Sequence, residues 1–115
     1  MRYKTLKRNG EFHRAYSRGK SCVGGCLVTY AIKKRTGPFR VGITSSKKIG
    51  NAVARNRARR VIRAALAQVL PNPPQGYDVV FVARAATAKK KSWQVARVMR
   101  RQLAETGVLE AEGEC

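Results

Sequence analysis

TSSKKIGNAVARNRARRVIR, residues 44–63, constrains the structure of this chain more than any other part of its sequence. A helix of about 3.6 residues per turn running over residues 51–70 would have two distinct faces. One face carries apolar residues at the i, i+3, i+4, i+7 spacing of a buried stripe, namely Ala54, Ala58, Val61, Ile62, Ala65 and Val69. The opposite face carries Asn56, Arg59, Arg60 and Arg63, with Arg55 and Arg57 flanking them.

The polar face of this helix contains no acidic residue. A solvated helix face ordinarily mixes Glu with Lys or Arg, because i,i+4 ion pairs stabilise the helix. Like charges within two turns repel one another, so this arrangement indicates that a polyanion binds here. Guanidinium groups suit that role, since they bind phosphate oxygens in a planar, bidentate manner. The stretch therefore predicts a helix with one buried side and one side that faces nucleic acid.

The charge of the whole chain supports the same conclusion. Its 115 residues are enough for one domain with a modest core, and 25 Lys and Arg stand against 6 Asp and Glu, a net charge of +19. No acidic residue lies between Phe12 and Tyr77. This predicts a large polyanionic partner. A membrane is a weaker candidate, because no apolar run approaches the ~20 residues of a span. No signal peptide is visible either, so we expect a cytoplasmic protein.

The sequence offers little for metal binding or catalysis. The C-x3-C spacing of Cys22 and Cys26 does not match a zinc knuckle, and His13 is a poor fourth ligand. We interpret these two cysteines as small buried side chains on one face of a strand, and the role of Cys115 is open. A protein nuclease needs metal-binding carboxylates or an acid–base pair, and the basic middle of the chain has neither. We expect no catalytic residue, and interpret His13 as a surface or RNA-edge contact.

The remaining pattern predicts a single α+β domain, an α-β-β-α-β-α sandwich with helices packed on a small mixed sheet. Residues 1–8 form a basic lead-in, and residues 106–115 a flexible acidic tail. A short first helix over residues 11–18 follows Asn9 as its N-cap. A last helix over residues 92–105 has Val95, Ala96, Met99 and Leu103 on its inner face.

Three strands are predicted between these helices. Residues 21–34 are rich in β-branched and aromatic residues, with a bend or bulge at Gly24-Gly25. A turn at residues 35–38 joins them to an alternating strand at residues 39–45, and we expect the two to form a hairpin. Residues 77–83 form a third, largely apolar strand, which we place at the centre of the sheet.

VGITSSKKIGNAVARNRARRVIR, residues 41–63, resembles the signature of the bacterial ribonuclease P protein component, whose central motif is matched by Arg55-Asn56-Arg57. The resemblance covers about residues 3–105. Ser45 and the Ala58-Arg59-Arg60 step depart from the family's usual pattern without changing its character. The other matching segments are Phe12 and Tyr16, the Gly-Lys-Ser step at 19–21, LVTY at 27–30 and DVVFVAR at 78–84.

The resemblance implies a protein that assists a catalytic RNA in removing the 5′ leader from precursor tRNA. The implied partners are that RNA and precursor tRNA, with no obligate protein partner and no membrane. Magnesium ions would be held mainly by the RNA, and none tightly by the protein alone. The family's basic helix also crosses between parallel strands with the rare left hand.

The resemblance also implies two sets of RNA-contacting residues. The set that would bind the catalytic RNA is Lys47, Lys48, Asn51, Arg55, Asn56, Arg57, Arg59, Arg60 and Arg63. The set that would line a leader-binding cleft between the first helix and the sheet is Phe12, Tyr16, Tyr30, Arg40, Lys89 and Lys90. Aromatic faces accept any base by stacking, which suits leaders of varied sequence.

Several alternatives remain open at this point. Phe12, Tyr16 and Tyr30 could be core residues, and Lys89-Lys90-Lys91 a solvated charge run. We interpret Trp93 as a packing residue of the last helix. A small ribosomal protein would have the same size and charge. A sequence-specific DNA-binding protein would need a helix-turn-helix arrangement, which the predicted strands before the basic helix argue against.

Overall fold

The computed structural model describes residues 3–109. This part of the chain forms three helices and five strands, with two short 3-10 turns, η1 and η2. The elements are β1 (Lys4–Thr5), α1 (Asn9–Arg18), β2 (Lys20–Val23), β3 (Leu27–Lys33), β4 (Arg40–Thr44), η1 (Lys47–Ile49), α2 (Ala52–Val69), β5 (Tyr77–Ala83), η2 (Thr87–Lys89) and α3 (Ser92–Glu105).

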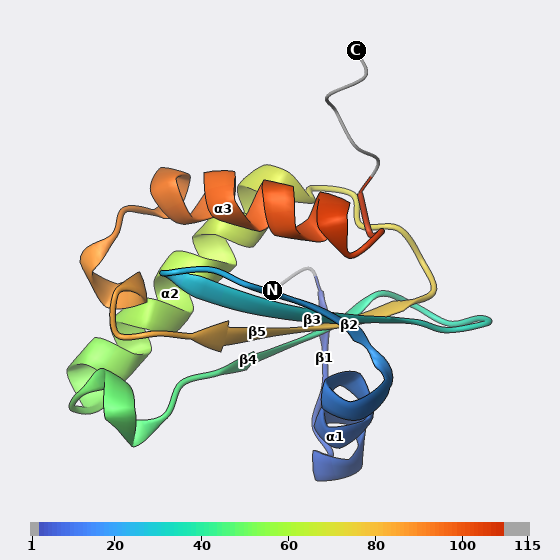
Figure 1. Ribbon diagram of the computed structural model, residues 1–115, viewed down its shortest axis with the longest axis horizontal. Helices are drawn as coiled ribbons and strands as arrows, with labels where there is room; N and C mark the ends of the chain where they lie inside the picture. Colours follow the sequence, from blue (N-terminus) through green and yellow to red (C-terminus); the bar gives the residue numbers. More distant parts are fainter. Residues whose placement is uncertain (1–2, 110–115) are drawn as a thin grey trace.

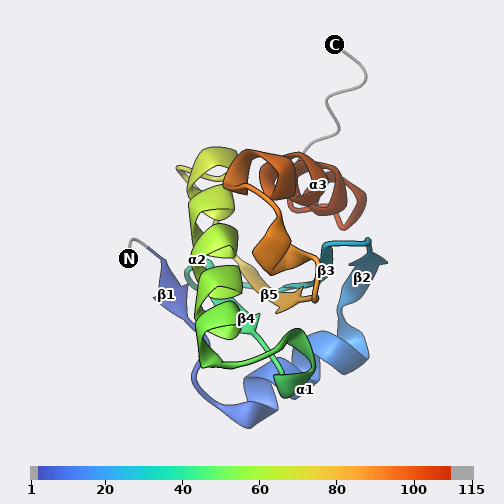
Figure 2. The same ribbon diagram turned by 90° about the vertical axis from the view of Figure 1, so that its left-hand side faces the viewer.

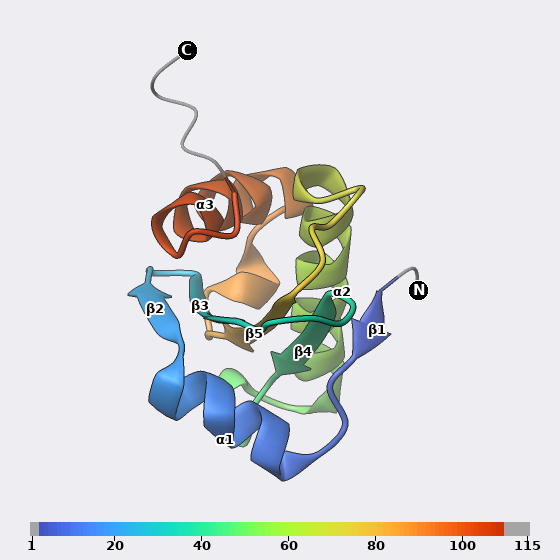
Figure 3. The ribbon, with the colours of Figure 1, turned by 90° about the vertical axis from the view of Figure 1, so that its right-hand side faces the viewer.

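The strands form one mixed sheet in the order β1-β4-β5-β3-β2. β5 runs parallel to β4 and antiparallel to β3. Helices α2 and α3 cover one face of this sheet, whereas α1 packs alone on the other face (Figure 1). The same three-layer arrangement is visible from the side that carries α2 (Figure 2) and from the opposite side (Figure 3). The predicted α+β class, with helices on a small mixed sheet, is confirmed.

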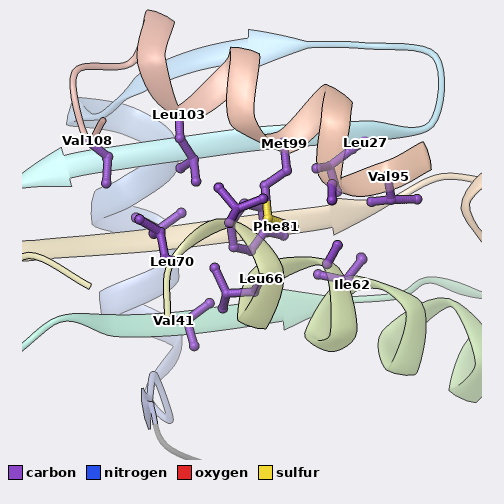
Figure 4. Packing of buried hydrophobic residues seen from close by; sticks show 14 of the residues in the cluster. Leu27, Val41, Ile62, Leu66, Leu70, Phe81, Val95, Met99, Leu103 and Val108 are labelled. Carbon is purple, nitrogen blue, oxygen red and sulfur yellow. The ribbon is translucent and has the colours of Figure 1, made fainter. Parts of the chain in front are cut away.

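The central position of β5 follows from its sequence, because its residues are apolar on both faces of the sheet. Val79 and Phe81 point into the larger core beneath α2 and α3, while Val80 belongs to a smaller cluster under α1. Phe81 is fully buried, among side chains that include Leu66 of α2 and Met99 of α3 (Figure 4). Strand 77–83 and its central place are therefore as predicted.

The predicted hairpin between residues 21–34 and residues 39–45 is wrong. β3 and β4 are not neighbours, because β5 lies between them. The loop between β3 and β4 is long enough to pass over β5, and it forms hydrogen bonds with Gly76, the residue before β5. Lys34 donates its backbone N–H to Gly76 O at 2.7 Å, and Gly76 donates to Gly37 O at 2.9 Å. The predicted turn at residues 35–38 is present, but the strand that follows it, β4, pairs with β5 and β1.

Gly24-Gly25 is a hairpin turn rather than a bulge in one strand. It divides the predicted strand 21–34 into β2 and β3, which pair antiparallel, and Gly24 donates its N–H to Leu27 O at 2.9 Å. The two cysteines consequently do not share a strand face. Cys22 is half-buried on β2, whereas Cys26 is buried in the turn. Cys115 lies outside the described residues.

The helix ends agree with the sequence to within two residues. α1 begins at Asn9 itself, so Arg8 occupies the N-cap position that was predicted for Asn9. Asn51 caps α2, since its Oδ1 accepts the Ala54 N–H at 2.9 Å. α3 has the predicted bounds, and Gln102 anchors it, accepting the Thr29 hydroxyl at 2.7 Å and donating to Leu27 O at 2.8 Å.

Both predicted flanks of the domain hold some structure. Within the basic lead-in, β1 pairs in parallel with β4, and the hydroxyl of buried Tyr3 donates to the Leu70 carbonyl at the end of α2. At the other end, Thr106 and Val108 are buried against the core. The rest of the predicted acidic tail, residues 110–115, lies outside the described part.

Candidate nucleic-acid interface

Helix α2 presents the two faces that its sequence predicts. Its buried face carries Ala58, Ile62, Ala65 and Val69, as expected, together with Leu66, and Ala54 and Val61 are half-buried at its edge. On the other face Asn56, Arg57, Arg60 and Arg63 are exposed, and Arg55 and Arg59 are half-buried. Lys47 and Lys48 are exposed in η1, which leads directly into the helix. The cations therefore form one continuous surface, here called the α2 basic face.

Two members of this predicted set also have structural partners. Asn51 is the N-cap described above, so its side-chain oxygen Oδ1 is occupied, whereas its Nδ2 has no hydrogen-bond partner within residues 3–109. Arg57 Nε donates to Ala88 O at 2.8 Å and so ties α2 to η2. The terminal nitrogens of this guanidinium remain available for phosphate, because only Nε is used.

A groove lies on the other face of the sheet, between α1 and the end of β4. It encloses about 450 Å³ and is lined by Asn9, Phe12, His13, Tyr16 and Thr44. Phe12 and Tyr16 are one helical turn apart, so their rings project from the same side of α1. We refer to this feature as the α1 groove.

Two aromatic contacts shape the α1 groove. The Tyr16 and Tyr30 rings meet edge to face, with centroids 4.9 Å apart and planes at 75°. Tyr16 is 40% exposed, while Tyr30 on β3 is half-buried. Phe12 packs against the small cluster under α1, which contains Leu6, Ala15 and Val80. Tyr16 thus keeps part of its ring exposed, and Tyr30 supports that ring from the sheet.

Arg40 lies in an ion-pair network beneath α1. Its Nη1 pairs with the Glu11 carboxylate of α1, and its Nη2 lies 2.8 Å from Asp78 Oδ2 on β5. Lys34 Nζ contacts the other Asp78 oxygen at 2.8 Å. The structure therefore gives Arg40, predicted as a cleft cation, two carboxylate partners, and the same pairs fix the position of α1 over the sheet.

The pKa values of these carboxyl groups are lowered. Backbone N–H groups of Arg8 and Lys7 donate to Glu11 and lower its pKa, and the Arg40 charge adds to this effect. Burial alone would raise the pKa of Asp78, but hydrogen bonds from Arg40 and Lys34 outweigh it, and the net shift is downward. Both groups are therefore ionised at neutral pH.

The α2 basic face and the α1 groove meet at a second, smaller cavity of about 220 Å³. Arg59 and Arg63 line it from α2, Phe12 from α1, and Gly42 with its β4 neighbours from the sheet. Phe12 thus borders both this cavity and the α1 groove. Sequence reasoning treated the two surfaces as separate, since nothing in residue spacing shows that helices on opposite faces of a sheet approach one another around its edge.

The structure places the remaining candidates elsewhere. Exposed Lys89 and Lys90 lie at η2, which packs against α2. This segment is on the opposite side of the sheet from α1 (Figure 2). Trp93 is 51% exposed on α3 and is not the packing residue that the sequence suggested. The apolar stripe of α3 is complete without it, so no core position is left for the indole.

Residues 3–109 contain neither a cluster of metal-ligating side chains nor a membrane-spanning helix. No group of three or more His, Cys, Asp or Glu side chains could hold a metal ion there. In the same range, no helix combines the length and apolar character that crossing a bilayer requires.

Comparisons with known proteins agree on one family. A family model described as ribonuclease P matches residues 1–107. The ribonuclease P protein component of Clostridium beijerinckii is 38% identical over 114 residues, covering 93% of this chain and 91% of that protein. Its counterpart from Clostridioides difficile is 41% identical over 87 residues, or 75% of this chain and 76% of the relative.

Solved structures show the same fold. The Staphylococcus aureus RNase P protein aligns with a TM-score of 0.78 and 30% identity, over 93% of this chain and 98% of that one. The RNase P protein of Thermotoga maritima aligns with a TM-score of 0.72 at 23% identity, over 94% and 99% of the two chains.

Proposed function

This chain belongs to the bacterial ribonuclease P protein family, and from that premise we propose how its two surfaces divide the work of binding RNA. It is a protein subunit of ribonuclease P, an endoribonuclease holoenzyme, and takes part in the 5′ maturation of tRNA. Membership in this family implies ribonuclease P RNA and precursor tRNA as partners.

The α2 basic face docks on the catalytic RNA. Its arginines have no acidic neighbour on the helix, and their planar guanidinium groups match phosphate oxygens. The buried stripe on the other side holds the helix rigidly on the core, so the cations keep a fixed spacing. Exposed Lys47 and Lys48 extend the same surface at the start of the helix. Backbone contacts of this kind position a protein on RNA without reading its sequence.

The α1 groove holds the single-stranded 5′ leader of precursor tRNA. Tyr16 supplies an exposed aromatic ring, and edge-to-face packing against Tyr30 holds that ring in place. Stacking on such a ring stabilises any base by about 1–3 kcal/mol, as a substrate set with varied leaders requires. Arg40 contributes here by positioning α1 through Glu11. Lys89 and Lys90, which lie at η2 beside α2, instead extend the surface that faces the catalytic RNA.

The observation that carries this proposal is the cavity shared by Phe12, Arg59 and Arg63. Because the leader begins where the catalytic RNA cleaves, a subunit that helps must hold both RNAs close together. The cavity brings a ring of the α1 groove beside two cations of the α2 basic face, which meets this requirement within one small domain.

The chemistry of cleavage belongs to the RNA partner. We infer that magnesium ions bind mainly to the RNA, with none held tightly by the protein alone, and that no protein side chain is catalytic. We further propose a cytoplasmic location, no obligate protein partner and no membrane contact. The β4-α2-β5 crossover has the rare left hand in this proposal.

The test is cleavage of precursor tRNA at low magnesium concentration by a bacterial ribonuclease P RNA, with and without this protein. We expect faster cleavage when protein and RNA are combined, and none with protein alone. Absence of stimulation, together with tight binding to ribosomal RNA, would contradict the proposal.

A further inference from the structure

Trp93 is the only tryptophan in the chain, and it lies half-exposed on the outer side of α3. Tryptophan is enriched at interfaces, because its large ring is apolar while its N–H group remains polar. The proposed RNA surfaces on α2 and α1 leave this side chain unexplained.

Trp93 lies in a groove of about 440 Å³, here called the α3 groove, whose other lining residues are Gln94, Arg97, Val98 and Arg101. Trp93, Arg97 and Arg101 follow one another at intervals of four residues, so they share a stripe along α3. The turn between β2 and β3 approaches the same helix, since a Cβ at Gly24 would stand 3.4 Å from Val98 Cγ1. The groove is therefore a fixed feature of the folded domain.

The two arginines of this groove have no direct carboxylate partner among the described residues. Within residues 3–109, neither Arg97 nor Arg101 forms an ion pair with a carboxylate. Glu105, one turn beyond Arg101, instead accepts a hydrogen bond from the Cys22 thiol at 2.8 Å. Two cations beside an exposed ring are the combination that binds unpaired nucleotides, because the ring stacks on a base while the guanidinium groups bind phosphate.

The position of the groove indicates which RNA it takes. The helix that carries it, α3, lies on the same side of the sheet as α2, whereas α1, which lines the α1 groove, lies on the opposite side (Figure 1). The exposed run Lys89-Lys90-Lys91 connects it to the α2 basic face, and Arg57 ties that run to α2 through Ala88. A second copy of this chain is a poor occupant, since it would bring like charges together at the same groove.

We propose that the α3 groove binds an unpaired segment of the catalytic RNA, with a base stacked on Trp93 and phosphates bound by Arg97 and Arg101. This inference rests on the proposed docking of α2 on the same RNA. It extends that interface across the basic run 89–91 to the third helix.

The emission of the single tryptophan provides a direct test. Ribonuclease P RNA is titrated into the full-length protein while binding is followed separately by filter retention. Stacking of a base on the indole quenches its emission, so we expect quenching that saturates with binding. The Arg97→Ala/Arg101→Ala variant should weaken RNA affinity about five- to 100-fold, whereas Arg35→Ala, an exposed arginine in the loop after β3, should change it by less than about threefold.

A matched pair of substitutions tests the ring itself. Trp93→Ala should weaken affinity about five- to 100-fold, and Trp93→Phe should recover most of this loss, with the same melting temperature for both because the side chain is half-exposed. RNA that binds without changing Trp93 emission would overturn this inference and leave the proposed function intact. RNA that does not bind at all would overturn both.

Two further results would also overturn the inference, because each would show that a different molecule occupies the α3 groove. One is quenching that appears only when leader-bearing precursor tRNA is added to the holoenzyme. The other is an emission change that depends on protein concentration without RNA, which would indicate a second copy of this chain.

Discussion

The ring of Phe12 lies directly on the backbone of Gly42, so that a Cβ placed at Gly42 would stand 2.5 Å from Phe12 Cε1. This contact seats α1 on β4 and explains why a strand that alternates apolar residues carries a glycine at its midpoint. It also sets the distance between α1 and the sheet, and therefore the depth of the α1 groove.

Gly42→Ala should therefore disturb the α1 groove. The added methyl displaces Phe12, and overpacking of this kind destabilises by about 1–3 kcal/mol. We expect a lower melting temperature and weaker binding of precursor tRNA by the holoenzyme. Gly25→Ala is the matched control, because a Cβ there meets no atom within 4 Å. Equal effects of the two substitutions would show that the Phe12 contact is unimportant.

Replacing Arg59 and Arg63 with Ala should weaken binding to the catalytic RNA without unfolding the protein. Each lost phosphate contact reduces the slope of log affinity against log salt by about 1, so the double variant should lose about 2. Affinities measured between low and moderate salt give this slope, and Arg35→Ala serves as the control for simple loss of charge. A large fall in melting temperature would mean that these arginines support the fold instead.

Tyr16→Ala should reduce the affinity of the holoenzyme for precursor tRNA while leaving its affinity for mature tRNA unchanged. Loss of one stacked base corresponds to about 1–3 kcal/mol, and Tyr16→Phe should retain most of the affinity because it keeps the ring. Equal losses for precursor and mature tRNA would exclude a leader-specific groove.

The ion pairs of Asp78 predict how stability depends on pH. The pKa of Asp78 is lowered in the folded protein, so its contribution is fully present above the unfolded pKa of about 3.9. That contribution is lost as the pH falls through the lower, folded value. The free energy of unfolding, measured by denaturant between pH 7 and pH 2.5, should therefore fall below about pH 4.

Asp78→Asn is the variant that isolates this effect. It leaves Lys34 without its carboxylate and Arg40 with Glu11 alone, and should destabilise the protein by about 1–3 kcal/mol at pH 7, with a shallower loss at acid pH than the parent. An unchanged acid slope would assign the pH dependence to another group.

The sequence predicted the elements whose side chains repeat with a clear period. The stripe of α2, the two-sided apolar run of β5 and the bounds of α3 were all correct. The pairing of the strands was predicted wrongly. The loop between Lys34 and Phe39 has the same turn signal whether the next strand pairs directly with β3 or lies one strand further away in the sheet. β1 was missed, since two paired residues leave no pattern.

In the candidate site too, features that follow from helical periodicity were predictable, and contacts between distant residues were not. The cations of the α2 basic face follow from helical periodicity, and their outward direction was predictable. The ion pairs of Arg40 with Glu11 and Asp78 were not predictable, because these two residues are 29 and 38 positions away in the sequence. The cavity shared by Phe12 and Arg63 depends on how two helices pass the edge of β4, which only the folded chain shows.

The most direct test maps both surfaces on the assembled holoenzyme. A hydroxyl-radical source is attached at position 13 in the α1 groove, or at position 60 on the α2 basic face, through His13→Cys or Arg60→Cys. The background carries Cys22→Ser and Cys115→Ser. The account predicts cuts in the precursor leader from position 13 and cuts in the catalytic RNA from position 60. Leader cuts from position 60, with none from position 13, would contradict it.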